Sequence, residues 1–430
     1  MRSCLLGDPT QNFTMRFLLQ FLLLGFALTA VTSVRADFWP EFRGETGQGL
    51  AEEAQVPLRW STSQNIRWKV PVNGKAWSSP VVADGMLFVS TAVLERKDLS
   101  LQAHAYSLVD GSLLWETEIF QKKEEYMHKK NSHASPTPLY EDGVLYCHFG
   151  HHGTAALDSR SGKILWTQNE LVYEPVHGTG GSPALWEDRL LFSCDGGEAP
   201  FVAALAKKTG QILWKTGRDV EVQRPFSFST PLLIEVEGEP QAIIPGSGAV
   251  ISYHPTTGEE IWRCHYGEGF SVVPRPLYHE GKVFVCSGFM VASLYAIRVD
   301  GEGDVTDTHI EWVAERQVPK ESSPILVDGL LYFNDDKGIL TCLDPATGDE
   351  HYRERLDGRG GYSASPVYAA GHLFFHNGDG VTTVVKPGTS FEQVAENEID
   401  EYGLSSFAVV SDGFIVRTEE HLLRIGAPTK

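Results

Sequence analysis

The stretch Ala156-Leu-Asp158-Ser-Arg-Ser-Gly162-Lys-Ile-Leu-Trp166 decides the fold, because close copies of it recur along the chain. Two of these copies are Ala204-Leu-Ala-Lys-Lys-Thr-Gly210-Gln-Ile-Leu-Trp214 and Ser252-Tyr-His-Pro-Thr-Thr-Gly258-Glu-Glu-Ile-Trp262. Looser copies end at Trp115 and, with Tyr in place of Trp, at Tyr352. A recurrence every roughly 20 to 50 residues is typical of a repeat architecture, in which each repeat is one supersecondary unit. Such a scaffold is a platform, so it does not by itself identify an activity.

A second signature precedes these stretches and consists of Ser-x-Pro, an apolar run, a turn and another apolar run. Its first copy is Trp77-Ser-Ser-Pro80-Val-Val-Ala-Asp84-Gly85-Met-Leu-Phe-Val. The corresponding starts contain Pro136, Pro183, Pro231, Pro276, Pro324 and Pro366, and Ala408 stands for proline in the last one. Asp-Gly between two apolar runs predicts a tight hairpin, since both residues tolerate a positive φ. Proline fits at the beginning of a strand because its nitrogen need not donate a hydrogen bond there.

Together the two signatures predict four short strands per unit, which is the size of a β-propeller blade. The eight starts predict an all-β fold, an eight-bladed β-propeller of four-stranded antiparallel blades over residues 65–427. The last unit has only three strands left, at 407–411, 414–417 and 421–425. A strand that begins at Asn65 is expected to complete this blade, because closure of the ring leaves no free edge. An open array and a seven-bladed ring with extra strands are the alternatives.

The repeated tryptophan is interpreted as a structural residue. A large aromatic side chain at the same place in each blade fills the wedge between neighbouring sheets. This girdle is expected to contain Trp68, Trp115, Trp166, Trp214, Trp262 and Trp312, with Tyr352 and Phe391 in the corresponding places of the last full blades.

The N-terminal 36 residues read as a signal peptide. Met15 and Arg16 precede a mostly apolar run at 17–31, which is too short for a membrane span, and Ala36 offers a small-residue cleavage site. Met15 is a candidate for the true start. These features predict a periplasmic or secreted protein that does not span the membrane and is a monomer. Residues 37–64 are expected to form an N-terminal extension that runs across the propeller as a strap.

Charge and cysteine usage exclude some classes of function. The formal net charge of −20 would repel phosphate backbones, so no nucleic-acid partner is expected. Five cysteines follow the signal segment, and each lies in or beside an apolar run, at Cys147, Cys194, Cys264, Cys286 and Cys342. Their odd number and setting favour buried small hydrophobic residues over a disulfide framework. No Cys-x-x-Cys motif indicates redox or zinc chemistry.

The residues just before each blade's proline are expected to gather at one mouth of the central channel. This candidate binding ring contains Trp77, His133, His177, Phe228, Arg275, Glu321 and Tyr362. Its aromatic side chains suit stacking, its imidazoles suit hydrogen bonding, and its one Arg suits an anion. The alternative is a water-filled mouth that binds nothing.

No metal site is predicted. Histidines are dense between His128 and His177, but His151 and His152 are neighbours on an expected strand or turn and would point different ways, and no spacing matches a zinc pattern. The acidic segment from Asp300 to Glu311 has carboxylates at alternate places, as calcium loops do. It lacks their central glycine, so it is interpreted as an acidic hairpin. No catalytic residue is assigned, because clusters such as Asp195-Gly-Gly-Glu198 also suit ordinary turns.

Repeated Ala-x-Asp-x-x-Thr-Gly-x-x-x-Trp segments resemble the pyrroloquinoline-quinone-like (PQQ-like) propeller repeat. That repeat is shared by quinoprotein dehydrogenases and by BamB-like scaffolds of outer-membrane protein assembly, and the resemblance covers residues 39–427. Several stretches are similar to exported single-domain propellers of planctomycetes, namely Trp39-Pro-Glu-Phe-Arg43-Gly, Trp77-Ser-Ser-Pro, Asn131 to Pro138, Phe270 to Pro276 and Gly303 to Thr306.

The sequence lacks several motifs of the quinoprotein dehydrogenases, and these differences decide which function we expect. The chain has no adjacent cysteine pair, no Cys-x-x-Cys-His haem motif, and no segment that matches their calcium ligands or catalytic Asp. The lipid-bearing Cys of the BamB-like scaffolds is also missing. The sequence therefore predicts a non-catalytic binding or scaffold propeller of the cell envelope, without a cofactor, whose partner is an envelope protein, a peptide or a carbohydrate. The alternatives are a quinoprotein oxidoreductase that uses PQQ with calcium on a sugar or alcohol, and a sensor or accessory domain.

Overall fold

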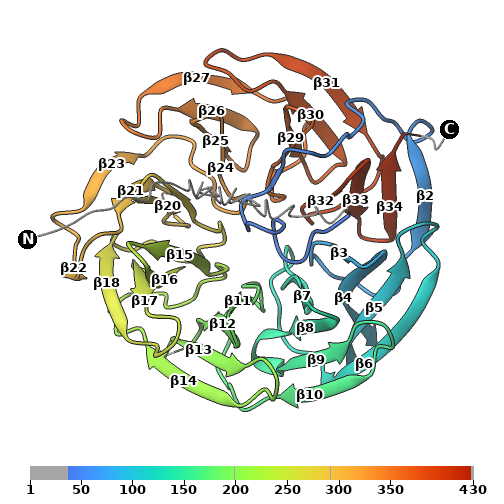
Figure 1. Cartoon of the computed structure of the whole chain (residues 1–430), viewed down its shortest axis with the longest axis horizontal. Coiled ribbons are helices and arrows are strands. Elements are labelled where there is room, and N and C mark those ends of the chain that lie inside the picture. Colours follow the sequence, from blue (N-terminus) through green and yellow to red (C-terminus); the bar gives the residue numbers. More distant parts are fainter. Residues whose placement is uncertain (1–36, 198, 291, 428–430) are drawn as a thin grey trace, which may run out of the picture. The chain divides into compact units, whose positions relative to one another are not determined.

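Eight β-sheets follow one another around a central axis in the computed structural model, which describes residues 37–197, 199–290 and 292–427 (Figure 1). The predicted signal segment, with Met15 and Ala36, lies outside the described residues. The first blade consists of β3 (Val81–Ala83), β4 (Met86–Glu95), β5 (Asp98–Ser107) and β6 (Leu113–Lys123), paired antiparallel in this order. The first strand of each blade lies nearest the axis and the fourth lies at the rim (Figure 1).

The next six blades repeat this order. The second blade consists of β7 (Leu139–Glu141), β8 (Val144–His148), β9 (Thr154–Asp158) and β10 (Ile164–Gln168). The third consists of β11 (Ala184–Trp186), β12 (Arg189–Cys194), β13 (Phe201–Ala206) and β14 (Ile212–Gly217). The fourth consists of β15 (Leu232–Val236), β16 (Glu239–Pro245), β17 (Ala249–Tyr253) and β18 (Glu260–His265). The fifth blade consists of β19 (Leu277–His279), β20 (Lys282–Cys286), β21 (Leu294–Arg298) and β23 (Ile310–Ala314). The sixth consists of β24 (Ile325–Val327), β25 (Leu330–Asn334), β26 (Ile339–Leu343) and β27 (Glu350–Arg355). The seventh consists of β28 (Val367–Ala369), β29 (His372–His376), β30 (Val381–Val385) and β31 (Gln393–Glu398). Two short strands are added in parallel, β1 (Leu50–Ala51) on β28 and β22 (Gly303–Asp304) on β18.

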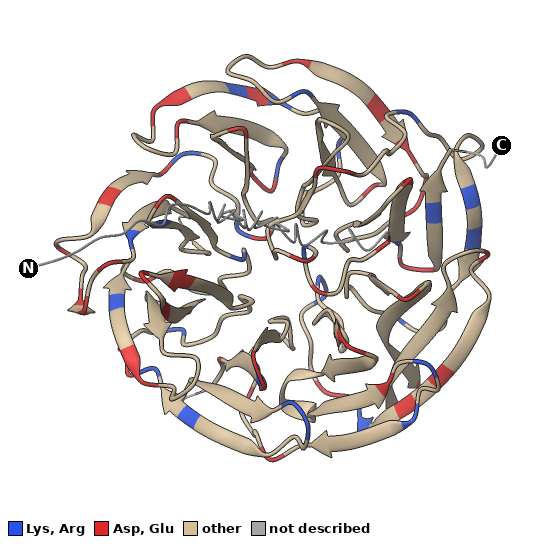
Figure 2. Cartoon of the chain, in the orientation of Figure 1, with Lys and Arg blue, Asp and Glu red and all other residues tan. Residues whose placement is uncertain are grey.

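The eighth blade joins the two ends of the repeat region, as predicted. Its strands β32 (Ala408–Val410), β33 (Gly413–Arg417) and β34 (His421–Gly426) are completed by β2 (Ile66–Pro71), which pairs antiparallel with β34. Acidic and basic residues both occur along the outer strands (Figure 2), and on β2 Arg67 forms an ion pair with Asp412 at 2.6 Å. The prediction of an eight-bladed propeller closed by an N-terminal strand is confirmed. Among the described residues, no helix has the length and apolar character that crossing a membrane requires.

Each repeated tryptophan packs on the next blade. The Trp166 indole N–H donates to the carbonyl of Lys207 at 2.9 Å, and a Cβ built on Gly210 would lie 2.5 Å from the Trp166 ring. The same pair of contacts joins Trp68, Trp115, Trp214 and Trp312 to the blades that follow them. Trp262 differs, because β22 covers the edge of its strand and its fully buried indole donates to Gln241 instead. The glycines that face these five indoles, Gly111, Gly162, Gly210, Gly258 and Gly348, are therefore required by contact as well as by their positive φ.

A ring of hydrogen bonds joins the blades around the axis. In most blades the residue before the first strand's proline is Ser or Thr, and its hydroxyl oxygen accepts the backbone N–H of the corresponding residue in the preceding blade. The donors and acceptors are Ser79 to Thr137, Thr137 to Ser182, Ser182 to Thr230, Arg275 to Ser323, Ser323 to Ser365, Ser365 to Ser406 and Ser406 to Ser79, at 2.8–3.2 Å. The ring is interrupted only where Arg275 replaces the hydroxyl residue.

Removal of one hydroxyl from this ring is expected to destabilise the fold. Ser365→Ala leaves the buried N–H of Ser323 without its acceptor at 2.9 Å, and an unsatisfied buried donor costs about 1–3 kcal/mol. Ser365→Thr is the matched control, because Thr137 and Thr230 occupy the corresponding places of two other blades. The free energy of unfolding in urea measures both variants. An equal loss in the threonine variant would show that the acceptor is not the cause.

Two buried histidines occupy corresponding places in blades 2 and 7. His148 is paired in the sheet with Thr154 and His376 with Thr382, and each imidazole Nδ1 lies 2.8–2.9 Å from the threonine hydroxyl. Burial lowers the pKa of His148 to about 3 and that of His376 to about 4. Both imidazoles are therefore neutral in the folded protein well below the pH at which an unfolded histidine takes up a proton.

The stability of the protein is expected to fall as the pH falls from about 6.5 toward 4. The unfolded chain then binds protons that the folded chain cannot accept, which costs about 1.4 kcal/mol per histidine and per pH unit. His376→Gln removes one such group, so the variant should take up about one proton fewer on unfolding. Its unfolding free energy should therefore depend less steeply on pH over this window. Urea unfolding at pH 7 and pH 4.5 measures this slope. Parallel slopes for the two proteins would contradict the assignment.

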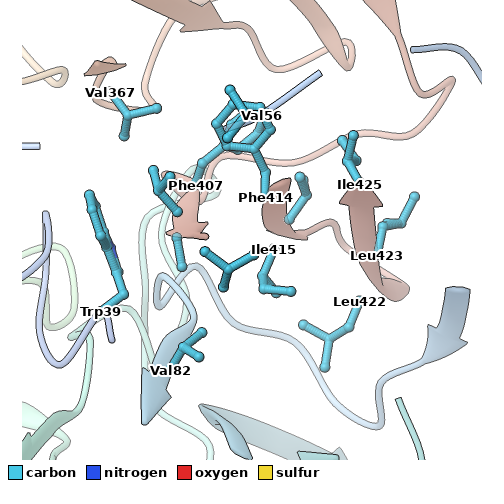
Figure 3. Packing of buried hydrophobic residues seen from close by; sticks show 14 of the residues in the cluster. Trp39, Val56, Val82, Val367, Phe407, Phe414, Ile415, Leu422, Leu423 and Ile425 are labelled. Carbon is cyan, nitrogen blue, oxygen red and sulfur yellow. The ribbon is translucent and has the colours of Figure 1, made fainter. Parts of the chain in front are cut away.

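The segment 37–64 contacts the first strands of several blades. Trp39 exchanges backbone hydrogen bonds with Val82 of β3, and β1 pairs with β28. The Arg43 guanidinium donates to the carbonyls of Gln48 and Pro324 at 2.7–2.8 Å. Burial lowers the pKa of Arg43 to about 9, and the positive charge of Arg275 adds to this. Figure 3 shows Trp39 and Val56 beside side chains of the eighth blade, which belong to one buried apolar cluster.

Candidate functional site

A cavity of about 420 Å³ lies where the blades converge. Most of its wall comes from one or two residues of each blade. All eight blades contribute the residue three places before the start of the first strand's segment, and six also contribute the residue one place before it. The first set is Trp77, Ser135, Gly180, Phe228, Val273, Glu321, Ser363 and Leu404, and the second is Ser79, Thr137, Ser182, Thr230, Ser365 and Ser406. The connections between blades and the N-terminal segment add Phe42, His128, Lys130, Asn131, His177, Phe270, Ser271 and Phe289.

The structure brings four of the seven candidate ring residues to this cavity and leaves three outside it. Trp77, His177, Phe228 and Glu321 line the cavity, whereas His133, Arg275 and Tyr362 do not. The buried Arg275 side chain turns to the N-terminal segment, where it bonds Glu41. The Tyr362 side chain is only 1% exposed, and its hydroxyl donates to the Asp357 carbonyl. His133 instead lies with its ring 6.1 Å from that of His152.

A stricter use of the sequence period would have found the missing wall residues. Residues three places and one place before the proline line the cavity in one blade after another, so the lining positions are two residues apart. The second blade begins at Pro138 and not at Pro136, so Ser135 takes the place expected for His133. In the same way, Val273 replaces Arg275 and Ser363 replaces Tyr362. Other wall residues come from the connections between blades, which do not repeat, so no period in the sequence could have indicated them. They include His128, Lys130, Phe270 and Phe289.

One side of the cavity is aromatic. Phe226, which lies behind the wall, has its ring centroid 5.9 Å from that of Phe228 and 5.5 Å from that of Phe270. Phe289 continues the cluster at 6.3 Å from Phe270. Trp77 lies on another blade and packs edge-on against Tyr402 at 5.7 Å. These faces suit stacking against a flat or apolar surface of a ligand.

The polar side chains of the cavity are mostly uncharged. The charged pair is Lys130 and Glu321, whose Nζ and Oε1 atoms lie 2.8 Å apart, and Ser363 donates to the same carboxylate. Burial opposes the charge of Lys130, but the hydrogen bond to Glu321 and the negative charge of that carboxylate outweigh it and raise the pKa of Lys130. The imidazoles of His128 and His177 supply further hydrogen-bonding groups, whereas the Asn131 side chain is already bonded to His177, Ser132 and Ser135. The site therefore has little net charge.

Phe42 reaches the cavity from the N-terminal segment, which is held in place by Arg275. The guanidinium Nη1 donates to the Glu41 carboxylate at 2.8 Å and to the Phe42 carbonyl at 2.7 Å, and Nε donates to the Pro231 carbonyl. Burial raises the pKa of Glu41, although the charge and hydrogen bond of Arg275 oppose that rise. Arg275 is thus an anchor for the segment that closes this part of the wall.

The lining residues do not fit PQQ with calcium. PQQ carries several carboxylates, yet Lys130 is the lone lysine or arginine among the described lining residues and is already paired with Glu321. Calcium takes about six to eight oxygen ligands, and Glu321 is the lone carboxylate of that lining. The side-chain oxygen of Asn131 already accepts hydrogen bonds from Ser132 and Ser135. Within this described lining, the hydrogen bonds also place no histidine against a serine hydroxyl, as an activated nucleophile would need.

The structure corrects one expectation about the histidines. Residues Gly150–His152 form the 3-10 turn η1, one of the two settings expected for them, but the rings of His151 and His152 do not point different ways and lie side by side with centroids 3.8 Å apart. In the acidic segment, the Asp304 carboxylate accepts hydrogen bonds from Thr306 in its own turn. The five described cysteines are free and buried, as predicted.

Comparisons with known proteins agree with this architecture. The family model described as outer membrane protein assembly factor BamB matches residues 59–169 and 200–425. The quinoprotein ethanol dehydrogenase of Pseudomonas aeruginosa is 27% identical over 147 residues, 30% of this chain and 23% of that enzyme. The outer membrane protein assembly factor BamB of Yersinia pestis is 27% identical over 154 residues, 27% of this chain and 39% of that protein. The chain thus spans about a quarter of the length of the quinoprotein relatives it matches.

Solved structures share the fold at low identity. BamB from Moraxella catarrhalis aligns with a TM-score of 0.57 and 13% identity, over 84% of this chain and 96% of that one. A europium-containing methanol dehydrogenase aligns with a TM-score of 0.64 and 12% identity, over 91% of this chain and 89% of that one. These similarities carry the fold alone, whereas the family model covers more than half of the chain. The chain therefore belongs to the BamB family of PQQ-like β-propellers.

Proposed function

We propose that this chain is an exported, non-catalytic binding propeller of the cell envelope, and that its ligand is a carbohydrate that enters the central cavity. The family supports a binding role, because its matching model is described as an assembly factor. The envelope location rests on the N-terminal sequence and on relatives named for the outer membrane. The cavity volume of about 420 Å³ is in the range of small-ligand sites.

The observation that carries the ligand class is the pairing of aromatic walls with uncharged polar groups. Trp77 and Phe228 offer faces that can stack on the apolar face of a sugar ring. The imidazoles of His128 and His177 supply nitrogen atoms with which sugar hydroxyl groups can form hydrogen bonds as donors or acceptors. Because Lys130 and Glu321 neutralise each other, a neutral ligand is favoured over a charged one.

An array of immobilised oligosaccharides, probed with residues 37–430, tests this proposal. Binding to a defined set of glycans is expected, and Phe228→Ala should weaken it at least tenfold, which is about 1.4 kcal/mol. Leu165→Ala is the matched control, because Leu165 is 51% exposed on the outer strand β10 and outside the cavity. Binding confined to a peptide array would overturn the ligand class and keep the cavity as the site. Equal glycan binding by both variants would overturn the cavity.

The alternative is the PQQ-dependent oxidoreductase, which the similarity to quinoprotein dehydrogenases favours. A calorimetric titration of residues 37–430 with PQQ and calcium tests it. Because the lining lacks the cations and oxygen ligands that this cofactor needs, no one-to-one binding is expected. A one-to-one response at micromolar PQQ that is lost in Trp77→Ala would establish a cofactor enzyme instead.

A further inference from the structure

Two segments of the second blade region bring three metal-ligating side chains together. Glu125 lies in the connection that follows β6, and His151 and His152 lie in η1, between β8 and β9. One ligand atom from each residue lies within 4.8 Å of those of the other two. The His151 Nε2 atom is already 2.8 Å from the Glu125 carboxylate. Among the described residues, one group of three or more metal-ligating side chains is close enough to share an ion, and it consists of these three residues.

The two imidazoles have unused nitrogen atoms in a buried position. The His152 side chain is 2% exposed, and its Nε2 atom has no hydrogen-bond partner in the protein. The Nδ1 atom of His151 is also buried and without a partner. A buried polar nitrogen without a partner costs about 1–3 kcal/mol, so its presence in a folded protein calls for an explanation. A cation bound to Nε2 of His152 would satisfy that atom, whereas the His151 atom that faces Glu125 is Nε2.

We propose that Glu125, His151 and His152 bind a divalent cation of the zinc class. Two imidazoles and one carboxylate are ligands that zinc accepts, whereas calcium takes oxygen ligands only. Three protein ligands leave a fourth tetrahedral position for water or for a further side chain. His133 is a candidate for that position, because its ring centroid lies 6.1 Å from that of His152.

The geometry requires a small contraction of the cluster. Zinc binds nitrogen and oxygen ligands at about 2.0–2.2 Å, so tetrahedral ligand atoms lie roughly 3.3 Å apart. The separations within 4.8 Å must therefore shorten by about 1.5 Å or less. Glu125 can adjust its own distances to the two imidazoles, since its carboxylate is 55% exposed on a connection between blades, and it is already 2.8 Å from His151 Nε2. The approach of the two imidazole nitrogens requires rotation of the His151 and His152 side chains.

The cation would fix a segment that also forms the cavity. The connection that carries Glu125 continues to His128, Lys130 and Asn131, which line the cavity. Coordination by η1 would clamp the beginning of this connection to the second blade. The site is separate from the carbohydrate proposal, because none of its three ligands lines the cavity.

Cobalt(II) is the probe for this site, because a tetrahedral Co(II) ion absorbs visible light much more strongly than octahedral aqueous Co(II) does. Residues 37–430, freed of metal by a chelator, are expected to bind one equivalent of Co(II) with this band, and Zn(II) should displace it. His151→Gln and Glu125→Gln should each weaken binding at least about 100-fold, more than the loss of an outer-shell partner does. The exposed Glu125 keeps the test valid if a histidine variant does not fold.

His265→Gln is the matched control. His265 faces Asp304 at 3.8 Å, a histidine–carboxylate pair without a third ligand, so its loss should leave the affinity unchanged. Thermal unfolding of each variant with and without Zn(II) gives a second readout. Stabilisation by Zn(II) should occur in the original sequence and in His265→Gln only. Absence of stoichiometric Co(II) binding, or equal binding by the Glu125 and His265 variants, would overturn the proposal.

Discussion

Arg275→Met is expected to lower the free energy of unfolding by about 3–5 kcal/mol at pH 8. The substitution leaves the Glu41 carboxylate without the guanidinium that lies 2.8 Å from it, and an uncompensated buried charge is among the costliest single defects. It also removes the donors to the carbonyls of Phe42 and Pro231. Because Phe42 belongs to the cavity wall, ligand binding should weaken together with stability. Urea unfolding and the glycan array measure the two effects.

The pH dependence of this loss identifies its cause. Burial already raises the pKa of Glu41, and loss of Arg275 removes the charge that opposes that rise. A carboxyl group with a raised pKa in the folded state contributes stability at low pH that is lost as the pH rises through that pKa. The loss in Arg275→Met should therefore be larger at pH 8 than at pH 5. The double variant Glu41→Gln/Arg275→Met should recover most of it, and an equal loss in both variants at both pH values would contradict the ion-pair explanation.

Gly210→Ala is expected to cost about 2–5 kcal/mol. Gly210 has a φ of +72°, where a side chain strains the backbone by about 1–2 kcal/mol. The added Cβ would also lie 2.5 Å from the Trp166 ring, and overpacking of this kind costs about 1–3 kcal/mol. The indole cannot retreat freely, because its N–H is bonded to the Lys207 carbonyl. Chemical unfolding measures the loss.

Gly329→Ala separates the two causes. Gly329 has the same φ of +72°, but a Cβ there meets no atom within 4 Å. This variant should therefore show the backbone strain alone, about 1–2 kcal/mol. The difference between the two variants reports the contact between neighbouring blades. If the two glycines cost the same, the Trp166 contact would contribute nothing to stability.

These two substitutions test different parts of the molecule. Gly210 belongs to the repeat, and its contact with Trp166 recurs with small changes around the ring. Arg275 interrupts the repeat, since it takes the place of the hydroxyl residue that other blades use to bond their neighbours. The departure from the repeat is thus the position that holds the N-terminal segment and, through it, part of the cavity wall.

The sequence by itself determined the fold, because the interactions that define a blade are local and repeated. Alternating apolar runs, Asp-Gly turns and the Gly-to-Trp interval each act within one unit, so every copy adds an independent observation. The closing strand at Ile66–Pro71 was predictable because the last unit lacked one strand and a free edge is unfavourable. Trp77, Phe228 and Glu321 could be placed near the axis for the same reason, since they precede a blade's first strand.

Only the tertiary structure decided the rest of the site. Lys130 meets Glu321 across 191 positions of sequence, and Glu125 meets His151 from a different connection, so no local period relates these partners. The side chain of Arg275 turns to Glu41 because a buried guanidinium needs an anion, and the anion comes from a segment far away in the chain. Repeats fix where blades lie, whereas long-range pairing of charged and polar groups on the connections fixes what the cavity and the histidine cluster can bind.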